Sequence, residues 1–219
     1  GLRWILNEYY TAITACGPID QAIFCSAFNV SPETVFITGL PRYECLANHL
    51  QCHRDQQKMS DTLKVLIAPT LRLDMREYET CLLGLLLKIE TEAKCKNNKW
   101  DVIFRPHPAQ KFSPTFVDFL IGLTHIQLDS SRDAQDSMLW SDVLVSDISS
   151  IIFDYSLLSR PLVLFFPDKE SFIELDRGVY PEVLERLYGR GVGKSPLEIT
   201  KIFKDLQVGK GTQLSEHMV

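Results

Sequence analysis

The sequence predicts an α/β protein with a doubly wound parallel sheet that carries helices on both faces. Short runs rich in Val, Ile, Leu and Phe alternate with longer segments in which apolar residues recur at helical spacing. This alternation indicates parallel pairing, because the return to a parallel strand needs a crossover connection, usually a helix. The 219 residues, 45% of them hydrophobic and 23% charged, are enough to build a packed core.

The first part of the chain reads as one strand-helix-strand unit followed by a linker helix. The expected elements are a strand at residues 11–15, a helix at 18–28 and a strand at 34–38. Residues 43–59 are polar, show helical spacing and end in a charged stretch, which is typical of a boundary. We therefore expect a first domain to end within residues 1–59 and a second domain to occupy residues 60–219.

The second part repeats the alternation of strand and helix. Its expected strands lie at residues 64–68, 100–105, 126–128, 142–146 and 162–166. Its expected helices lie at residues 77–95, 116–120, 134–140, 149–158 and 196–206. Ser195 precedes the last of these helices as its expected N-cap, and acidic Asp133 stands at the start of the helix at 134–140, where the positive end of the helix dipole favours an acid. Ligands of such sheets bind beyond the carboxyl ends of the strands, so reactive residues are expected directly after strands.

Composition narrows the classes of function and location. The 23 Lys and Arg against 28 Asp and Glu leave a formal charge of -5, without the basic surface that nonspecific nucleic-acid binding requires. No apolar run approaches the roughly 20 residues that cross a bilayer. The six cysteines form no CxxC pair, and most have apolar neighbours typical of buried thiols in a reducing cytoplasm. The sequence begins at Gly1 with neither an initiator Met nor a signal peptide, so we expect the gene product to be longer.

His107 is the first candidate for a functional residue. It follows an expected strand within Arg105-Pro106-His107-Pro108, where two prolines restrict the backbone and present the imidazole from a stiff corner. A lone histidine packed beside a turn is the structural alternative. Arg105 and the position at a strand end favour a binding or catalytic role for His107, with Arg105 as a ligand-binding neighbour. Thr70 and Arg72 follow the preceding strand and are expected at the same edge.

Ser149 and Ser150 form a second candidate, because they open an expected helix directly after a buried strand. Free N–H groups and the positive end of the helix dipole attract phosphate at that position, and a diphosphate would fit. Simple capping by one serine is the alternative. Asp154, one turn further, is expected to accept hydrogen bonds from ribose or polyol hydroxyls, or else to be a surface acid. Arg160 either brings a cation toward the anion or faces solvent at a helix end.

A possible zinc site is rejected. Cys45, His49, Cys52 and His53 occur at helical spacing, but adjacent Cys52 and His53 would point about 100° apart on a helix. The stretch also lacks the glycines of a metal-binding turn. We therefore expect no zinc site in this stretch.

The ordered motifs resemble those of the CDP-glycerol glycerophosphotransferases, a family that includes teichoic acid polymerases and capsule enzymes. The similar segments are TGLPR at residues 38–42, APTLR at 68–72, RPHP at 105–108, SDVLVSDISSIIFDY at 141–155 with Arg160-Pro161 after it, and FPD at 166–168. The resemblance extends over residues 11–180. Ile148 stands where the family usually has Tyr.

The resemblance implies the carboxyl-terminal, Rossmann-like domain of a two-domain GT-B transferase, preceded by a remnant of the first domain. It implies CDP-glycerol as donor substrate and no metal or other cofactor. His107 would contact the donor's β-phosphate, Ser149 and Ser150 would hold the diphosphate, and Asp154 would bind the nucleoside side. A hydroxyl of the growing polymer would attack the β-phosphorus, and CMP would leave.

The family's WHGTP-like motif, which carries the expected general base, is absent from these 219 residues. We therefore expect a carboxyl-terminal fragment that binds nucleotide but transfers poorly. The implied partner is a polymer or lipid-linked acceptor, which places the protein at the cytoplasmic face of the bacterial membrane through segments outside this chain. Two alternatives stay open: a GT-B glycosyltransferase that uses a nucleotide sugar, and a nucleotide-binding module without catalysis.

Overall fold

A computed structural model describes residues 11–53, 61–74, 76–129, 131, 133–176 and 195–209. The chain divides into two compact units, Gly1–Arg54 and Asp55–Val219, hereafter unit 1 and unit 2. The domain boundary expected between residues 59 and 60 lies outside the described residues.

Unit 1 contains a parallel β-α-β arrangement. Its elements are β1 (Ile13–Ala15), α1 (Pro18–Phe28), the 3-10 helix η1 (Pro32–Thr34), β2 (Val35–Ile37) and α2 (Tyr43–His53). Strands β1 and β2 pair in parallel, with Ile13 opposite Val35. Pro18 is at the first position of α1, where its missing N–H is not needed, and Asn29 ends this helix in a left-handed conformation.

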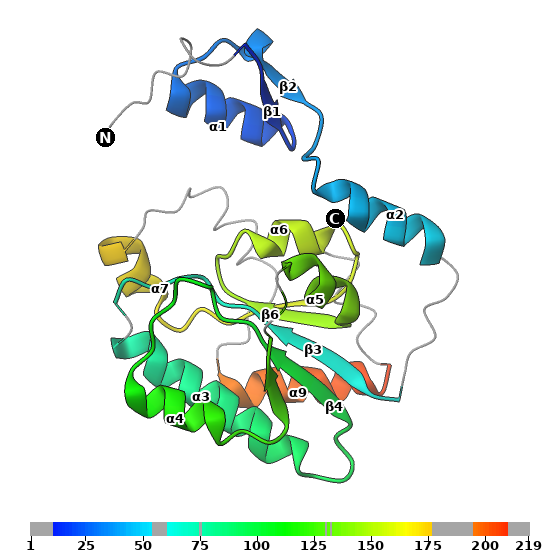
Figure 1. Ribbon diagram of the computed structural model, residues 1–219, viewed down its shortest axis with the longest axis vertical. Helices are drawn as coiled ribbons and strands as arrows, with labels where there is room; N and C mark the ends of the chain where they lie inside the picture. Colours follow the sequence, from blue (N-terminus) through cyan, green and yellow to red (C-terminus); the bar gives the residue numbers. More distant parts are fainter. Residues whose placement is uncertain are drawn as a thin grey trace. The chain divides into compact units, whose positions relative to one another are not determined.

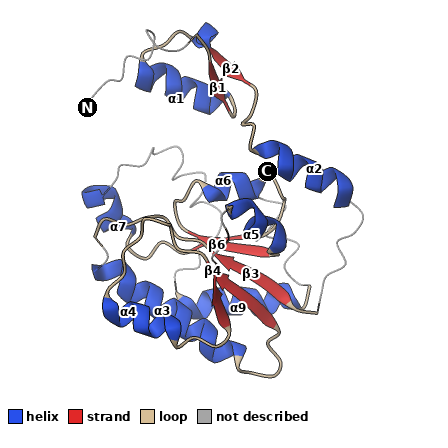
Figure 2. Cartoon of the chain, in the orientation of Figure 1, coloured by secondary structure: helices blue, strands red, loops and turns tan. Residues whose placement is uncertain are grey.

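Unit 2 is built on a five-stranded parallel sheet in the order β5-β4-β3-β6-β7 (Figure 2). The strands are β3 (Leu63–Ile67), β4 (Trp100–Phe104), β5 (Ile126–Leu128), β6 (Val143–Ser146) and β7 (Leu162–Leu164). From the central β3 the chain proceeds outward to β4 and β5, and it then returns to the other side for β6 and β7. The strand order therefore reverses between β3 and β6, the place where open α/β sheets bind ligands.

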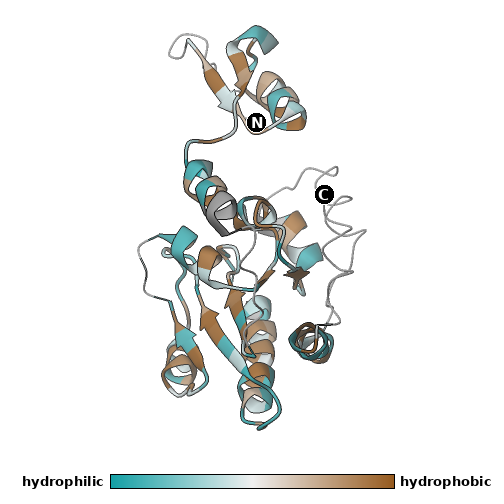
Figure 3. Ribbon diagram, turned by 90° about the vertical axis from the view of Figure 1, so that its right-hand side faces the viewer, coloured by the Kyte–Doolittle hydropathy of each residue, from teal (hydrophilic) through white to brown (hydrophobic). Residues whose placement is uncertain are grey.

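Helices cover both faces of this sheet (Figure 1). They are α3 (Arg76–Ala93), α4 (Pro114–Ile121), α5 (Ala134–Trp140), α6 (Ile151–Ser156), α7 (Lys169–Ser171), the π-helix η2 (Phe172–Asp176) and α9 (Pro196–Gln207). Helices α3, α4 and α9 pack on the face that presents alternate strand residues such as Val65, Val102 and Val145. Because the other face is also covered, the strands are apolar almost throughout, as their hydropathy in Figure 3 shows.

The predicted strands and helices correspond to observed ones, with small shifts at their ends. The helix expected from Ser149 begins at Ile151, and the last strand ends at Leu164. Ser195 caps α9 as predicted, because its side chain accepts a hydrogen bond from the backbone N–H of Glu198. Asp133, expected only as an acid at the start of a helix, caps α5 in the same way through the N–H of Gln135. The α7-η2 segment was not predicted, since three to five residues are too few to show helical periodicity.

Two further expectations concern cysteines and membranes. The prediction of mostly buried thiols is wrong for the described part of the chain, where Cys16, Cys45 and Cys95 are exposed and Cys25 and Cys81 are half-buried. Cys16 and Cys95 lie in loops and Cys45 on the exposed side of α2, whereas Cys25 and Cys81 pack at the margin of the two cores. Short-range apolar context does not reveal this difference. Among the helices described, none has the length and apolar character to span a bilayer.

Candidate functional site

Asp147 joins the carboxyl ends of β3 and β6, where the strand order reverses. Its side chain is fully buried and accepts hydrogen bonds from Thr70 N–H (3.0 Å), Thr70 Oγ1 (2.6 Å) and Ser149 N–H (3.2 Å). One carboxylate thus holds two strand-end loops together. The donors of Thr70 and the N–H of Ser149 are already engaged with the protein.

Arg72 is the buried cation of the same cluster. Its guanidinium is bound to Asp147 Oδ2 (2.9 Å) and, through two nitrogens, to Asp168 (2.7 and 3.0 Å). It lies 4.2 Å from the ring centres of both Tyr78 and Phe172. Burial alone would lower the pKa of Arg72, but the hydrogen bond to Asp168 and the charge of Asp147 outweigh burial and raise it. Arg72 is therefore permanently charged, with its side chain turned into the protein.

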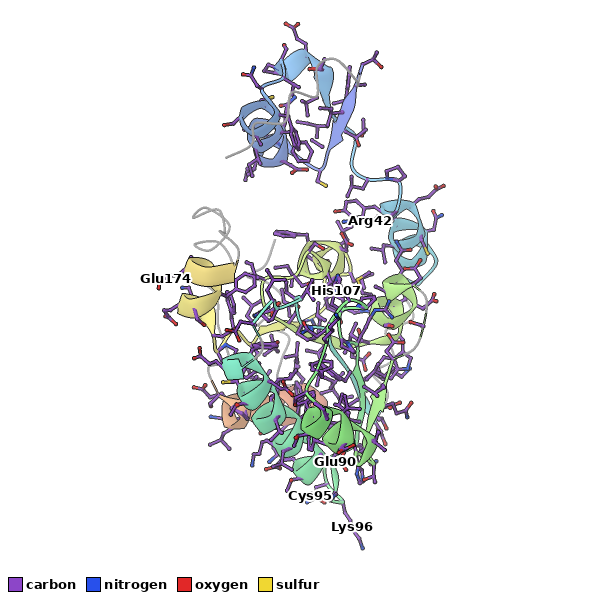
Figure 4. All side chains as sticks on the ribbon, turned by 60° about the vertical axis from the view of Figure 1, so that its left-hand side comes forward. Arg42, Glu90, Cys95, Lys96, His107 and Glu174 are labelled. Atoms are coloured by element: carbon purple, nitrogen blue, oxygen red, sulfur yellow. The ribbon has the colours of Figure 1, made fainter. Side chains whose placement is uncertain are left out.

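His107 lies at the same edge, in the exposed loop after β4 (Figure 4). The backbone N–H of Ala109 donates to its Nδ1 (3.1 Å). A ring nitrogen that accepts a hydrogen bond carries no proton, so the neutral imidazole has its N–H at Nε2. His107 thus offers a hydrogen-bond donor to an incoming ligand.

Ser149 and Ser150 bring two hydroxyls to the end of β6. Within the described part of the chain neither hydroxyl has a hydrogen-bond partner, and Ser150 precedes α6 without capping it through its side chain. Ser149 is half-buried and Ser150 is exposed. Asp154, in α6, is 9% exposed, which excludes the reading of a surface acid. Its expected contact with a nucleoside stays a prediction.

Arg105 is engaged with the loop that follows β5. One guanidinium nitrogen donates to Asp129 (2.8 Å), to the Ser131 carbonyl (3.0 Å) and to the Ser131 hydroxyl (2.7 Å). Burial would raise the pKa of Asp129, but hydrogen bonds from Ser137 and Arg105 lower it to about 2. The contacts of Arg105 are thus those of a residue that holds a neighbouring loop.

Arg160 lies apart from the other candidates, which corrects its prediction as a donor-binding residue. Its guanidinium donates to the backbone carbonyls of Met138 (3.2 Å) and Leu139 (2.8 Å), at the end of α5. Arg160 precedes β7, whereas His107 follows β4. Because all five strands are parallel, the two residues belong to opposite edges of the sheet. The cation stabilises the carbonyl end of a helix.

Hydrogen-bond donors for an anion therefore lie after two strands at the same edge of the sheet: Nε2 of His107 follows β4, and the hydroxyls of Ser149 and Ser150 follow β6. Sequence reasoning missed Asp147, Asp168 and Gln110, which hold these loops. An acid directly after a buried strand and two residues before a pair of serines was a usable signal for Asp147. The described residues contain no group of three or more His, Cys, Asp or Glu that would hold a metal ion. The side chains of residues 49–53, which include three members of the rejected zinc motif, lie outside that description.

Comparison with known proteins identifies related sequences and folds. Residues 6–214 match the family model described as CDP-Glycerol:Poly(glycerophosphate) glycerophosphotransferase. The teichoic acid ribitol-phosphate polymerase TarL of Staphylococcus aureus is 26% identical over 188 residues, which cover 76% of this chain and 31% of that protein. The teichoic acid poly(glycerol phosphate) polymerase of Staphylococcus epidermidis is 29% identical over 196 residues, covering 84% and 26%. The chain thus spans about a third or less of these two relatives.

A solved structure confirms the fold class. The wall teichoic acid polymerase TagF, as its H444N variant soaked with CDPG, superposes with a TM-score of 0.68 at 23% identity. The superposition covers 96% of this chain and 52% of that one. The predicted Rossmann-like α/β architecture of a GT-B protein is therefore correct.

Proposed function

The chain belongs to the CDP-glycerol:poly(glycerophosphate) glycerophosphotransferase family, and from this premise we propose that the carboxyl edge of its unit 2 sheet binds the diphosphate of a CDP-linked polyol. The observation that carries the proposal is the set of unengaged donors beside the reversal of strand order. His107 follows β4, and Ser149 and Ser150 follow β6, so the two loops flank the central β3. A diphosphate accepts hydrogen bonds from neutral donors of this kind.

Each residue then has a distinct role toward the donor. His107 donates its Nε2–H to a β-phosphate oxygen, and the hydroxyls of Ser149 and Ser150 donate to the diphosphate. Asp154 accepts from hydroxyls of the nucleoside. Thr70 and Arg72 act one step back, because their donors hold Asp147 and Asp168 in place. Arg105 holds the loop after β5.

The proposed reaction is transfer of a polyol phosphate to a growing teichoic-acid-type polymer. A hydroxyl of the acceptor attacks the β-phosphorus, a new P–O bond forms, and the bond to the CMP oxygen breaks with its electron pair leaving on CMP. The hydroxyl proton passes to a base that we place in the acceptor-side domain of the whole protein. The chain described here contributes donors that hold the diphosphate and offset charge on the transferring group.

The acceptor and the location of the protein follow from the same proposal. A polymer that grows on a lipid would bring the whole protein to the cytoplasmic face of the membrane, through segments outside this chain. The roles assigned above require no metal, so a chelator should leave donor binding unchanged.

Calorimetric titration tests the proposal. We expect CDP-glycerol or CDP-ribitol to give a saturable signal that His107→Ala weakens. Binding of a UDP-sugar with no response to either CDP-polyol would instead favour a glycosyltransferase. A donor that binds but is not turned over by the longest natural form of the protein would favour a nucleotide-binding module.

A further inference from the structure

We propose that Gln110 is a positioning residue that holds the His107 imidazole in register with Ser149. The inference rests on the proposed function for its effect on donor binding, but the geometry of the loop stands independently. Gln110 belongs to no motif that predicted the site, and its neutral side chain is half-buried at the carboxyl edge of the sheet.

The side chain of Gln110 joins the loop after β4 to the loop after β3. Its Oε1 accepts the backbone N–H of Arg72 at 2.8 Å. Its Nε2 donates to the carbonyl of Arg72 at 3.4 Å and to that of Lys111 at 3.2 Å. One amide therefore bonds to both backbone groups of the same residue in a neighbouring loop, which fixes the separation of the two loops as well as their register.

The backbone of Gln110 closes the turn that carries His107. Its N–H donates to the His107 carbonyl at 2.8 Å, within the same turn in which Ala109 N–H donates to the ring. The orientation and tautomer of the imidazole thus depend on a turn whose last residue is held by Arg72.

Arg72 continues this connection to the second half of the site. Its guanidinium is bound to Asp147, and Asp147 accepts the N–H of Ser149. A contiguous series of bonds runs from His107 through Gln110, Arg72 and Asp147 to Ser149. Because Arg72 and Asp147 are almost fully buried, their positions are the fixed reference. The side chain of Gln110 connects the exposed loop that carries His107 to the buried Arg72 and Asp147.

Ordinary loop packing is the competing explanation, and the two differ in how they depend on His107. A residue that merely stabilises its loop would affect donor binding whether or not the imidazole is present. A residue that acts through His107 loses its effect once the imidazole is removed. A double-mutant cycle measures this difference.

The experiment measures the dissociation constant of CDP-glycerol by calorimetry for wild type, Gln110→Met, His107→Ala and the double variant. Met keeps the length of the side chain but has no amide. We expect Gln110→Met to weaken binding by about 3- to 10-fold in the wild-type background. In the His107→Ala background we expect less than about a 2-fold effect. An equal effect in both backgrounds would overturn the proposal.

Gln127→Met is the matched control, because Gln127 lies exposed on β5. It should bind CDP-glycerol like wild type. Gln110→Ala tests side-chain bulk: if Ala weakens binding while Met matches wild type, packing rather than hydrogen bonding holds the loop, and the proposal is wrong.

Nitrogen-15 spectra of the histidine rings supply a readout that needs no donor. In wild type we expect His107 to have its proton at Nε2, and in Gln110→Met we expect a shift toward a mixture of tautomers. If CDP-glycerol fails to bind wild type but the ring signals respond to Gln110→Met, the proposed function fails and the positioning role stands. Ring signals identical to those of Gln127→Met would refute positioning whatever the donor does.

Discussion

At each of the two edges of the unit 2 sheet, a buried carboxylate accepts hydrogen bonds from a neighbouring loop, but the two edges differ in the donors they leave available. At the amino edge, Glu90 of α3 accepts Thr124 N–H (3.1 Å), Thr124 Oγ1 (2.6 Å) and His125 N–H (2.9 Å). At the carboxyl edge, Asp147 accepts the same two groups of Thr70. Each carboxylate is buried and ties a loop to its neighbours, and Figure 4 shows how far Glu90 lies from His107.

The difference lies in the histidine beside each carboxylate. His125 directs Nδ1 at Glu90 Oε1 (3.0 Å), so that nitrogen carries a proton and is engaged with the protein. His107 Nδ1 accepts a backbone N–H instead, and its proton is at Nε2. Similar residues thus produce a closed structural cluster at one edge and an open set of donors at the other. Residue type alone therefore does not indicate a binding site. Hydrogen-bond donors that the fold leaves without a protein partner do indicate one.

Arg72→Met should have the largest effect on stability. It would leave Asp147 and Asp168 as buried carboxylates without their cation, so we expect the free energy of unfolding to fall by about 3–5 kcal/mol. Urea denaturation followed by tryptophan fluorescence measures it. Lys99→Met is the control, because its partner Asp61 is exposed and the pair should contribute less than about 1 kcal/mol. Equal midpoints for the two variants would show that the buried cluster is not a stabilising centre.

Substitution of each histidine separates binding from stability. We expect His107→Ala to weaken CDP-glycerol binding by about 1–3 kcal/mol, the range for one lost hydrogen bond to a charged group, with little change in unfolding. His125→Ala should do the reverse, because its ring contacts Glu90 and not the proposed site. Calorimetry and urea denaturation of both variants provide the check. Loss of donor binding in His125→Ala would remove the distinction between the edges.

Glu90→Gln should lower the free energy of unfolding by about 1–3 kcal/mol at neutral pH, since an amide N–H₂ would face donors of the Thr124–His125 loop. Burial would raise the pKa of Glu90, but hydrogen bonds from Thr124 and His125 lower it from 4.5 to about 2. A pKa lowered by folding means that the ionised form stabilises above about pH 4.5. This stabilisation is lost as the pH falls toward 2.

Unfolding curves at several pH values test whether stability falls as Glu90 becomes protonated. Wild type should lose stability between about pH 5 and pH 2 more steeply than Glu90→Gln, whose residue 90 does not titrate. Parallel curves for the two proteins would argue against the lowered pKa. Donor binding by Glu90→Gln at neutral pH should match wild type.

The smallest effect is expected at Lys204 of α9. Hydrogen bonds from Lys204 and Lys88 lower the pKa of Glu92 to about 2. Lys204→Met removes one of them, but the lysine is 47% exposed, so we expect a loss of at most about 1 kcal/mol. The loss should vanish below about pH 2, where Glu92 is protonated in both proteins. A larger loss that persists there would indicate packing of the lysine stem instead of charge.

Local pattern was sufficient for most of the fold. Apolar runs located the strands of unit 2, and Asp133 and Ser195 marked helix starts, because these signals act over one or two turns. The α7-η2 segment was missed because its helices are too short to show helical periodicity. At the site, the strand-end position of His107, Ser149 and Ser150 followed from parallel pairing. By contrast, the carboxylates bound by Arg72 and Arg105 and the carbonyls bound by Arg160 lie 19 to 96 residues away in the sequence.

The sequence by itself determined the α/β class, the strands of unit 2 and the residues that directly follow them at the carboxyl edge. Each of these depends on neighbours along the chain. Only the tertiary structure decided which polar groups remain available there. Asp147 engages both donors of Thr70 and the N–H of Ser149, and Arg160 lies at the opposite edge. The physical reason is that a buried polar group must find a partner, and the partner nearest in space is often remote in sequence.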